Sequence, residues 1–487
     1  MKKLKKILTI LILTLAIAGV SPVFATTRIK EYTDEYKKYL ELTDEEKSKI
    51  LTPRMFEVKN SKSNYNNPIK YLRNKMTSFE SEFQLSQYIP ENVIVRNQMQ
   101  TNSCWAFAAL SSLETNLALN NYYNNLPTKT YDFSERHMEY ATSRTFLNGV
   151  KNPNTTTREV GSGGNDLFAI PYFTNGSGAI NESDMPFENN KNKISISKIQ
   201  NKTVTSQVYD TVLFEASDSE ENKNIIKNHV KTYGSVAVGI HGAKVNSEYY
   251  NSSTGAIYCD DEENAPCDHE VSIVGWDDNY SRTNFNAKHR PTNNGAWIIK
   301  NSWGTTVGKN GFMYVSYEDV NVYTLTYGII RASDQINYEN IYQYDYCGPE
   351  AAFTEDELNG TPLYLANIFN KKTSGTEYIT QVGIYSTEGY TCRVYVNPNG
   401  TGKNKSDLKA VKLKTGDSQT VDTVGYHTLE FLNPIKINAD SFVVAIEITG
   451  SDSDQVSYAT ELQLAKSDWA DVEIESGKCF ITTKRFE

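Results

Sequence analysis

Long hydrophobic runs are missing from this sequence beyond its N-terminus, and no recognisable wall-sorting tail is present. A transmembrane helix needs about 20 consecutive apolar residues, so we expect a mature chain with no transmembrane segment that is soluble outside the cell. The exception lies at the start, where four lysines within residues 2–6 precede an apolar run at 7–20 and a small-residue site at 23–25. This pattern predicts an export signal peptide over residues 1–25; a membrane anchor is the alternative.

Positive charge is also scarce. The chain has 49 lysine and arginine residues against 59 aspartate and glutamate residues, which gives a formal net charge of -10 at pH 7. Because residues 1–25 contain four lysines and no acidic residue, removal of the signal peptide changes this charge to -14. Proteins that bind nucleic acids neutralise phosphates with lysine and arginine, so the acidic balance argues against nucleic acid as a partner.

The chain is too long, at 487 residues, for a single hydrophobic core, so two or three domains are expected. From about Asn337 onward it consists of short alternating runs separated by turn signals, which is typical of a β-sandwich. The charged stretch from residue 26 to about 83 contains Thr43 followed three residues later by Glu46. This capping-box pattern predicts the start of a helix.

The most informative segment joins a lone cysteine to the start of a helix. A polar run ends at Ser103, and apolar residues then recur at helical spacing at positions 107, 110, 113 and 117, so Cys104 is expected in the first helical turn. Unpaired main-chain N–H groups and the helix dipole favour a thiolate there. A buried, unreactive cysteine is the alternative.

Two further segments supply the partners that a reactive cysteine needs. His269 precedes an alternating, strand-like run at 271–276, and Asn301 opens the segment Asn-Ser-Trp-Gly. With Gln98 placed six residues before Cys104, this set resembles the papain family of cysteine proteases over roughly residues 86–330. Neighbouring features resemble a narrower group, the secreted clostridial surface proteases with an attached lectin-like domain.

The resemblance implies the fold as well as the chemistry. It is α+β: a two-lobed papain-like fold with a helical left lobe and a β-rich right lobe, followed by a β-sandwich lectin-like domain. Cys104 would come from the left lobe, and His269 and Asn301 from the right. The implied divisions are a signal peptide at 1–25, a propeptide at 26–85, a papain-like peptidase domain at 86–332 and the lectin-like domain at 333–487.

The resemblance also implies a role for each catalytic residue. Cys104 would attack the scissile carbonyl as a thiolate, His269 would be its imidazolium partner, and Asn301 would orient the imidazole ring. The Gln98 side chain and the Cys104 N–H would form the oxyanion hole; a surface glutamine without a role is the alternative. Catalysis of this kind requires no cofactor.

Four residues are expected to form the substrate-binding surface. Gly163 and Gly164 would let a peptide backbone lie close and pair with the chain. Trp303 would shield the hydrogen bond between Asn301 and His269 from water. Glu270 departs from the family pattern, which has a small residue after the histidine, and its carboxylate would favour lysine or arginine at the second substrate position; orientation toward solvent or pairing with a nearby cation are the alternatives.

Two of the six cysteines are candidates for a disulfide, and the others besides Cys104 are three in number. Cys259 and Cys267 bracket a short acidic loop before His269, and a disulfide between them is expected in an exported chain. Thr101 stands where papain has a cysteine, so the usual left-lobe disulfide is absent. If Cys104 is unpaired, one of the remaining cysteines is also unpaired: Cys347, Cys392 or Cys479.

The combined prediction is a secreted cysteine endopeptidase made as a zymogen, extracellular or loosely attached to the wall of a Gram-positive bacterium. Its expected partners are protein or peptide substrates, its own propeptide as an inhibitor, and a cell-surface glycan. The resemblance adds a structural calcium within 333–487, although no EF-hand-like or other metal-ligand spacing is present. The alternatives are a glycan-binding adhesin with an inactive peptidase-like domain, and a peptidoglycan amide hydrolase, for which Asn-Ser-Trp-Gly is the wrong signature.

Overall fold

The computed structural model describes most of the chain beyond the predicted signal peptide, and its gaps are short except at 59–78 and 461–476. The predicted signal peptide and Cys347 lie outside the described residues, as does the part before residue 79 of the propeptide cleavage window predicted at about Lys75 to Tyr88. Within the described ranges, no helix is both long and apolar enough to cross a membrane. The described residues are 26–47, 49–58, 79–152, 158–190, 192–242, 247–261, 265–344, 348, 351–356, 358–450, 455–460 and 477–483.

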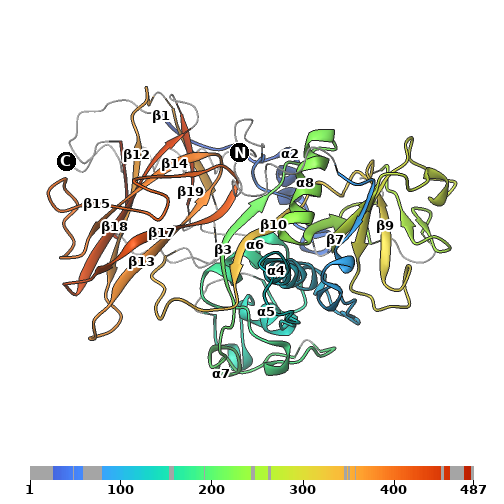
Figure 1. The fold of residues 1–487 in the computed structure, drawn as a ribbon, viewed down its shortest axis with the longest axis horizontal. Coiled ribbons are helices and arrows are strands. Elements are labelled where there is room, and N and C mark those ends of the chain that lie inside the picture. Colours follow the sequence, from blue (N-terminus) through green and yellow to red (C-terminus); the bar gives the residue numbers. More distant parts are fainter. Residues whose placement is uncertain are drawn as a thin grey trace.

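The first lobe is built around one long buried helix, α4 (Cys104–Tyr123), which lies near the centre of the molecule in Figure 1. Apolar and small residues occur on all of its faces, and every residue from Cys104 to Leu119 is buried. A helix that is apolar all round belongs in a core. Shorter helices surround it: α5 (Glu135–Ala141), α6 (Asp166–Thr174), α7 (Ser197–Gln200), and the 3₁₀ turns η2 (Leu85–Gln87), η3 (Pro90–Asn92), η4 (Leu147–Gly149) and η5 (Glu182–Asp184).

The second lobe is a twisted sheet that packs against the same helix. Strands β4, β7, β8 and β9 are consecutive antiparallel neighbours, β10 borders β4, and α4 contacts β4, β7 and β10. Helix α8 (Glu220–Tyr233) covers β7 and β10. The strands are β2 (Glu82–Gln84), β3 (Gln207–Leu213), β4 (Val236–Ile240), β5 (Tyr250–Asn251), β6 (Ala256–Ile257), β7 (His269–Asp277), β8 (Ala296–Lys300), β9 (Phe312–Ser316) and β10 (Thr326–Ser333), with the turn η6 (Arg282–Asn284) before β8.

The C-terminal region is all strand and forms two layers around its own core, at the left of Figure 1. One layer has the order β15-β14-β18-β12-β20, and β13 with β17 belongs to the other. Alternating apolar residues from both layers meet inside, as a half-buried strand pattern predicts. The strands are β11 (Ala351–Asp356), β12 (Leu363–Asn370), β13 (Tyr378–Ser386), β14 (Tyr390–Asn397), β15 (Lys409–Val411), β16 (Gln419–Val421), β17 (Gly425–Lys436), β18 (Ser441–Gly450), β19 (Val456–Thr460) and β20 (Cys479–Thr482).

The two regions are joined edge to edge, because β17 pairs with β3 and so extends the sheet of the second lobe. Asp210 on β3 organises this junction. Its carboxylate accepts hydrogen bonds from the Thr428 main-chain N–H at 3.1 Å and from Arg331 Nε at 2.5 Å. Arg331 also pairs with Glu430 on β17. A main-chain pairing and a buried charge network therefore fix one domain against the other.

The N-terminal segment touches both regions. Strand β1 (Thr26–Ile29) pairs with β11, which pairs with β19, and this makes a three-stranded sheet with the C-terminal region. Helices α2 (Asp34–Glu41) and α3 (Asp44–Lys47) follow. The capping box predicted at the start of α3 is confirmed, because the Thr43 N–H donates to Glu46 Oε2 and the Glu46 N–H donates to Thr43 Oγ1.

Replacing Asp210 with alanine tests the junction. The change removes charge-assisted hydrogen bonds, each worth about 2 kcal/mol, so the Asp210→Ala protein should unfold at a lower midpoint in scanning calorimetry. The exposed Asp417→Ala variant is the control and should unfold like the wild type. Equal midpoints for all three proteins would show that the network adds nothing to the junction.

Candidate active site

The cysteine stands where the sequence pattern placed it. Cys104 is the first residue of α4, directly after Ser103, so the predicted helix start is confirmed. Its side chain is buried, with the residue 6% exposed. Main-chain hydrogen bonds at Trp105 and Glu270 reach the sulfur. The nucleophile candidate is therefore held by the N-terminus of a helix in one lobe and by a strand of the other.

His269 and Asn301 come from neighbouring strands of the second lobe. His269 begins β7, and Asn301 directly follows β8, its antiparallel partner. His269 Nε2 donates a hydrogen bond to Asn301 Oδ1 at 2.9 Å, and the Trp303 ring stacks on the imidazole with 4.4 Å between centroids. Because Asn301 occupies Nε2, the other imidazole nitrogen, Nδ1, remains for chemistry.

Gln98 is fixed by two hydrogen bonds that leave part of its amide unused. Its Oε1 accepts from Ser302 Oγ at 2.7 Å, and its Nε2 donates to the Thr101 carbonyl at 2.8 Å. An amide nitrogen carries two hydrogens. The second is therefore available for a developing oxyanion, and the bond to Ser302 ties Gln98 to the segment that carries Asn301.

The glycine pair is required by close packing on a tryptophan. A Cβ at Gly164 would lie 2.5 Å from the ring of Trp105, which no side chain can tolerate. Gly163 has a φ of 83°, a conformation that favours glycine, and its carbonyl accepts from Arg158 Nε. The Arg158 guanidinium in turn lies 4.8 Å from the centroid of Trp105. These contacts fix the loop that contains Gly163 and Gly164 against the first turn of α4.

A buried carboxylate joins the two segments around the nucleophile. Glu139 Oε2 accepts from Ser103 Oγ at 2.7 Å, and Oε1 accepts from the Gly161 N–H at 2.8 Å. Asn102 Nδ2 also donates to the Gly161 carbonyl at 2.9 Å. Thr101 is not a cysteine, so no disulfide starts there. Hydrogen bonds to Glu139 connect the start of α4 to the loop at residues 161–164 instead.

Residues 49–58, here called the crossing segment, bridge the two lobes. The Leu51 N–H donates to the Cys267 carbonyl at 2.9 Å in the second lobe. The Thr52 carbonyl accepts from Asn165 Nδ2 at 3.0 Å in the first. Since Asn165 follows the glycine pair and Cys267 lies two residues before His269, the crossing segment runs over the place where the catalytic groups face each other.

The catalytic pair is electrically neutral in this covered state. Burial raises the pKa of the Cys104 thiol to about 12, against the main-chain hydrogen bonds at Glu270 and Trp105. Burial lowers the pKa of His269, although the bond to Asn301 opposes the shift. The helix dipole alone would favour a thiolate, but desolvation outweighs it while the crossing segment is in place.

Glu270 does not face solvent and carries no charge. It is fully buried, and its Oε1 accepts a hydrogen bond from the Tyr327 hydroxyl at 2.7 Å. Burial raises its pKa well above the usual range, so the carboxyl is protonated at neutral pH. The charge expected from Glu270 toward a substrate cation is therefore not present in this arrangement.

The predicted disulfide is wrong, because Cys259 and Cys267 are both free thiols. The Cys267 sulfur packs on Gly239 and hydrogen-bonds with the Thr324 side chain, so it is held within the strand layer. The Cys259 N–H is bound by the Asp319 carboxylate at 2.8 Å. The strand that carries His269 is braced by sheet pairing and these polar contacts rather than by a covalent bridge.

The calcium expected in the C-terminal region stays a prediction. Among the described residues, no group of three or more histidine, cysteine, aspartate or glutamate side chains could hold a metal ion. Calcium sites are built mainly from carboxylate and carbonyl oxygens, and the donor set that such a site needs is not visible here. We therefore assign calcium no residues and no role.

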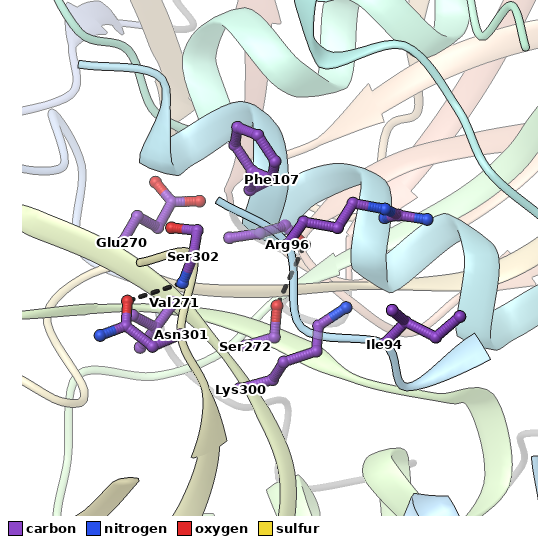
Figure 2. A pocket seen from close by; sticks show the side chains of 10 residues that line it. Ile94, Arg96, Phe107, Glu270, Val271, Ser272, Lys300, Asn301 and Ser302 are labelled. Atoms are coloured by element: carbon purple, nitrogen blue, oxygen red, sulfur yellow. Dashed lines mark hydrogen bonds between the residues drawn. The ribbon is translucent and has the colours of Figure 1, made fainter. Parts of the chain in front are cut away.

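A charged pocket behind Asn301 was not predicted from the sequence. Figure 2 shows it with Glu270 and Asn301 at one end and Ile94 at the other. Burial lowers the pKa of Lys300 in this pocket to about 8, opposed by nearby carboxylates that include Glu114. Arg96 pairs with Glu114 of α4 at 2.8 Å. Lys300 is the chain neighbour of Asn301, whereas Arg96 and Glu114 are remote in sequence and reach this pocket only through folding.

Comparison with known proteins defines the class. Residues 89–331 match the papain family of cysteine proteases, and residues 341–486 match the lectin-like domain family. The chain therefore contains a papain-family cysteine protease domain followed by a lectin-like domain. Over 223 residues it is 25% identical to cysteine proteinase 1 of Zea mays, covering 45% of this chain and 51% of that protein. Over 227 residues it is 24% identical to cathepsin L of Sarcophaga peregrina, covering 47% and 56%.

The chain thus spans about half the length of these curated relatives, and a solved structure resembles it more completely. The structure of the cysteine protease and lectin-like domains of Cwp84, a surface layer associated protein of Clostridium difficile, has a TM-score of 0.76 and 23% identity. It covers 95% of this chain and 94% of that one. A second Cwp84 structure, obtained after propeptide cleavage, has a TM-score of 0.70 at 24% identity, covering 84% and 95%. The predicted α+β papain-like fold followed by a lectin-like domain is confirmed.

The Glu139 connection can be broken selectively. Glu139→Ala would leave the Arg158 guanidinium buried without this carboxylate, a change that typically costs about 3–5 kcal/mol. We expect a lower unfolding midpoint and loss of peptidase activity, whereas Glu139→Gln keeps one acceptor oxygen and loses less. Glu188→Ala removes an exposed pair with Arg136, worth at most about 1 kcal/mol, and is the control. A Glu139→Ala protein as stable as this control would disprove the connection.

The neutral state of Cys104 predicts a pH dependence. With its pKa raised to about 12, the thiol should react slowly with iodoacetamide at neutral pH, and the rate should keep rising through pH 9. Removing the crossing segment restores solvent to the sulfur, so the rate at pH 7 should increase. Peptide mass mapping identifies alkylated Cys104 in each form. Equal rates at pH 7 before and after removal would contradict the prediction.

Proposed function

We propose that the protein is a secreted cysteine endopeptidase made as a zymogen, which hydrolyses peptide bonds in surface or extracellular proteins. The observation that carries this proposal is the hydrogen bond between His269 and Asn301 under the Trp303 ring, set beside Cys104 at a helix start. This pairing leaves one imidazole nitrogen for the thiol. The crossing segment over the same place supports the zymogen part of the proposal.

The chemistry follows from the residue roles. His269 takes the proton of Cys104, and the thiolate attacks the scissile carbonyl carbon to form a tetrahedral intermediate. The Gln98 amide and the Cys104 N–H donate hydrogen bonds to its oxyanion. As the intermediate collapses, His269 protonates the leaving amine and an acyl-enzyme remains. Water activated by His269 then releases the carboxylic acid and regenerates the thiol.

Asn301 contributes by positioning rather than by charge. Its amide oxygen accepts from Nε2 and so fixes the ring orientation and tautomer, while its Nδ2 contacts the Met313 sulfur at 3.1 Å. An amide adds no negative charge near the imidazole, which leaves the thiolate as the only anion of the pair. The stacked Trp303 keeps water away from this hydrogen bond.

The lectin-like domain supports localisation at a surface. We propose that it binds a cell-surface glycan and so holds the peptidase near wall-associated proteins, where tethering raises the effective substrate concentration. The similar Clostridium difficile protein is described as surface layer associated. For this chain, export through the predicted signal peptide and attachment to a Gram-positive cell surface are parts of the same proposal.

Intact mass spectrometry of the precursor tests the function most directly. The precursor without residues 1–25 is incubated with a reductant, with wild type and Cys104→Ala side by side. Loss of about 60 N-terminal residues in the wild type alone would demonstrate processing that depends on Cys104. A denatured protein substrate, added to both, reports peptidase activity independently of processing.

Other outcomes point to the other functions. If neither protein is trimmed or cleaves the substrate, even after treatment with an outside protease that removes the N-terminal segment, the endopeptidase proposal fails. Fluorescent glycan binding would then support the adhesin. Release of stem-peptide fragments from purified wall would support the amide hydrolase.

A further inference from the structure

The crossing segment inserts an arginine between the first residues of β10 and the end of β3. Arg54 Nη1 donates to the Phe214 carbonyl, and Nη2 donates to the Thr326 carbonyl. Thr326 precedes Tyr327, whose hydroxyl binds Glu270, the residue that follows His269. Arg54 therefore binds the main chain at the start of β10, directly before the residue whose side chain contacts Glu270.

A buried carboxylate provides the charge partner. Asp166, at the start of α6, is 4% exposed and lines the same cavity as Arg54, a space of about 80 Å³ bounded by the N-terminal segment, α6 and the C-terminal region. Asp166 is the acidic group whose electrostatic attraction stabilises the Arg54 cation. Burial raises the Asp166 pKa, and Arg54 opposes that rise.

Removal of the crossing segment would take the cation away from Asp166 and open the cavity that residues 54–58 help to line. A recessed carboxylate that loses its partner is destabilised. The Phe214 carbonyl would lose its donor, while the Thr326 carbonyl would keep only the Phe214 N–H. Glu270 does not substitute, because it is protonated and bound to Tyr327. The vacated place is therefore complementary to another guanidinium.

We propose that this place is the pocket for a substrate arginine, that Asp166 is its specificity-determining residue, and that Arg54 occupies it as an internal substitute for that arginine. The inference rests on the proposed peptidase function and names its substrate class. The Phe214 and Thr326 carbonyls accept hydrogen bonds from two different nitrogens of Arg54. This arrangement fits a planar guanidinium better than the compact ammonium of lysine. Specificity expected from a carboxylate at Glu270 is thus assigned to Asp166 instead.

Fluorogenic peptides test the pocket in the mature enzyme. Peptides with arginine, lysine, leucine or glutamine at the second residue before the scissile bond are compared. Glu270, the residue after His269, is expected to line the pocket for this position. We expect the highest kcat/KM for arginine. Asp166→Asn should lower kcat/KM for the arginine peptide by roughly 10- to 100-fold, as the loss of a charge-assisted interaction predicts, with little effect on the leucine peptide.

Asp184→Asn is the matched control, because it removes an exposed carboxylate from the same lobe and should leave the preference unchanged. Cleavage of the leucine peptide without any arginine preference would overturn this inference while the proposed function stands. An arginine preference that survives Asp166→Asn would overturn the role of Asp166. Failure to cleave any peptide would overturn the proposed function, and the inference with it.

The precursor offers a measurement that does not require catalysis. Arg54→Met keeps the length of the side chain but removes its charge, so the crossing segment should bind less tightly and Cys104 should be alkylated faster, by roughly 10-fold or more. Lys37→Met, an exposed change on α2, is the control. Alkylation of the Arg54→Met precursor at the wild-type rate would show that Arg54 does not anchor the segment.

Discussion

The catalytic geometry depends on the packing of one helix against one sheet. Helix α4 carries Cys104 and lies against β4, β7 and β10, while β7 carries His269. A single hydrophobic core extends across this boundary, so the two lobes fold around the same apolar centre. Because packed interiors deform little, this contact fixes the relative position of the thiol and the imidazole.

Buried hydrogen bonds fix the position of α4 more closely than hydrophobic packing alone. On α4, Asn116 Nδ2 donates to the Tyr233 and Ile329 carbonyls at 2.8 and 3.0 Å, which locks the helix to the second lobe. Glu139 connects Ser103, directly before α4, to Gly161 in the glycine-containing loop. Each of these groups is buried and hydrogen-bonded, as a polar group in a low-dielectric interior must be. Together these hydrogen bonds connect the segments around α4 without a disulfide bond.

The N-terminal segment contacts both lobes and the C-terminal region. Strand β1 pairs with β11 of the C-terminal region, the crossing segment contacts both lobes, and Arg54 binds the main chain at the start of β10. One stretch of chain therefore bridges the two lobes, places a cation in the cavity that Asp166 lines and adds an edge strand to the neighbouring domain. Its loss would change the protonation state of Cys104 and expose the arginine pocket in a single event.

The sequence by itself determined the class of fold through its family motifs, and the helix start at Cys104 and the capping box at Thr43 through local patterns. It also predicts the catalytic residues. It also placed the change to short strands near Asn337. Tertiary structure alone decided that Glu270 is buried and neutral, that Cys259 and Cys267 stay apart as thiols, and that Asp166 meets Arg54. Charge state, thiol pairing and specificity depend on burial and on distances between residues remote in sequence, and those quantities exist only once the chain has folded.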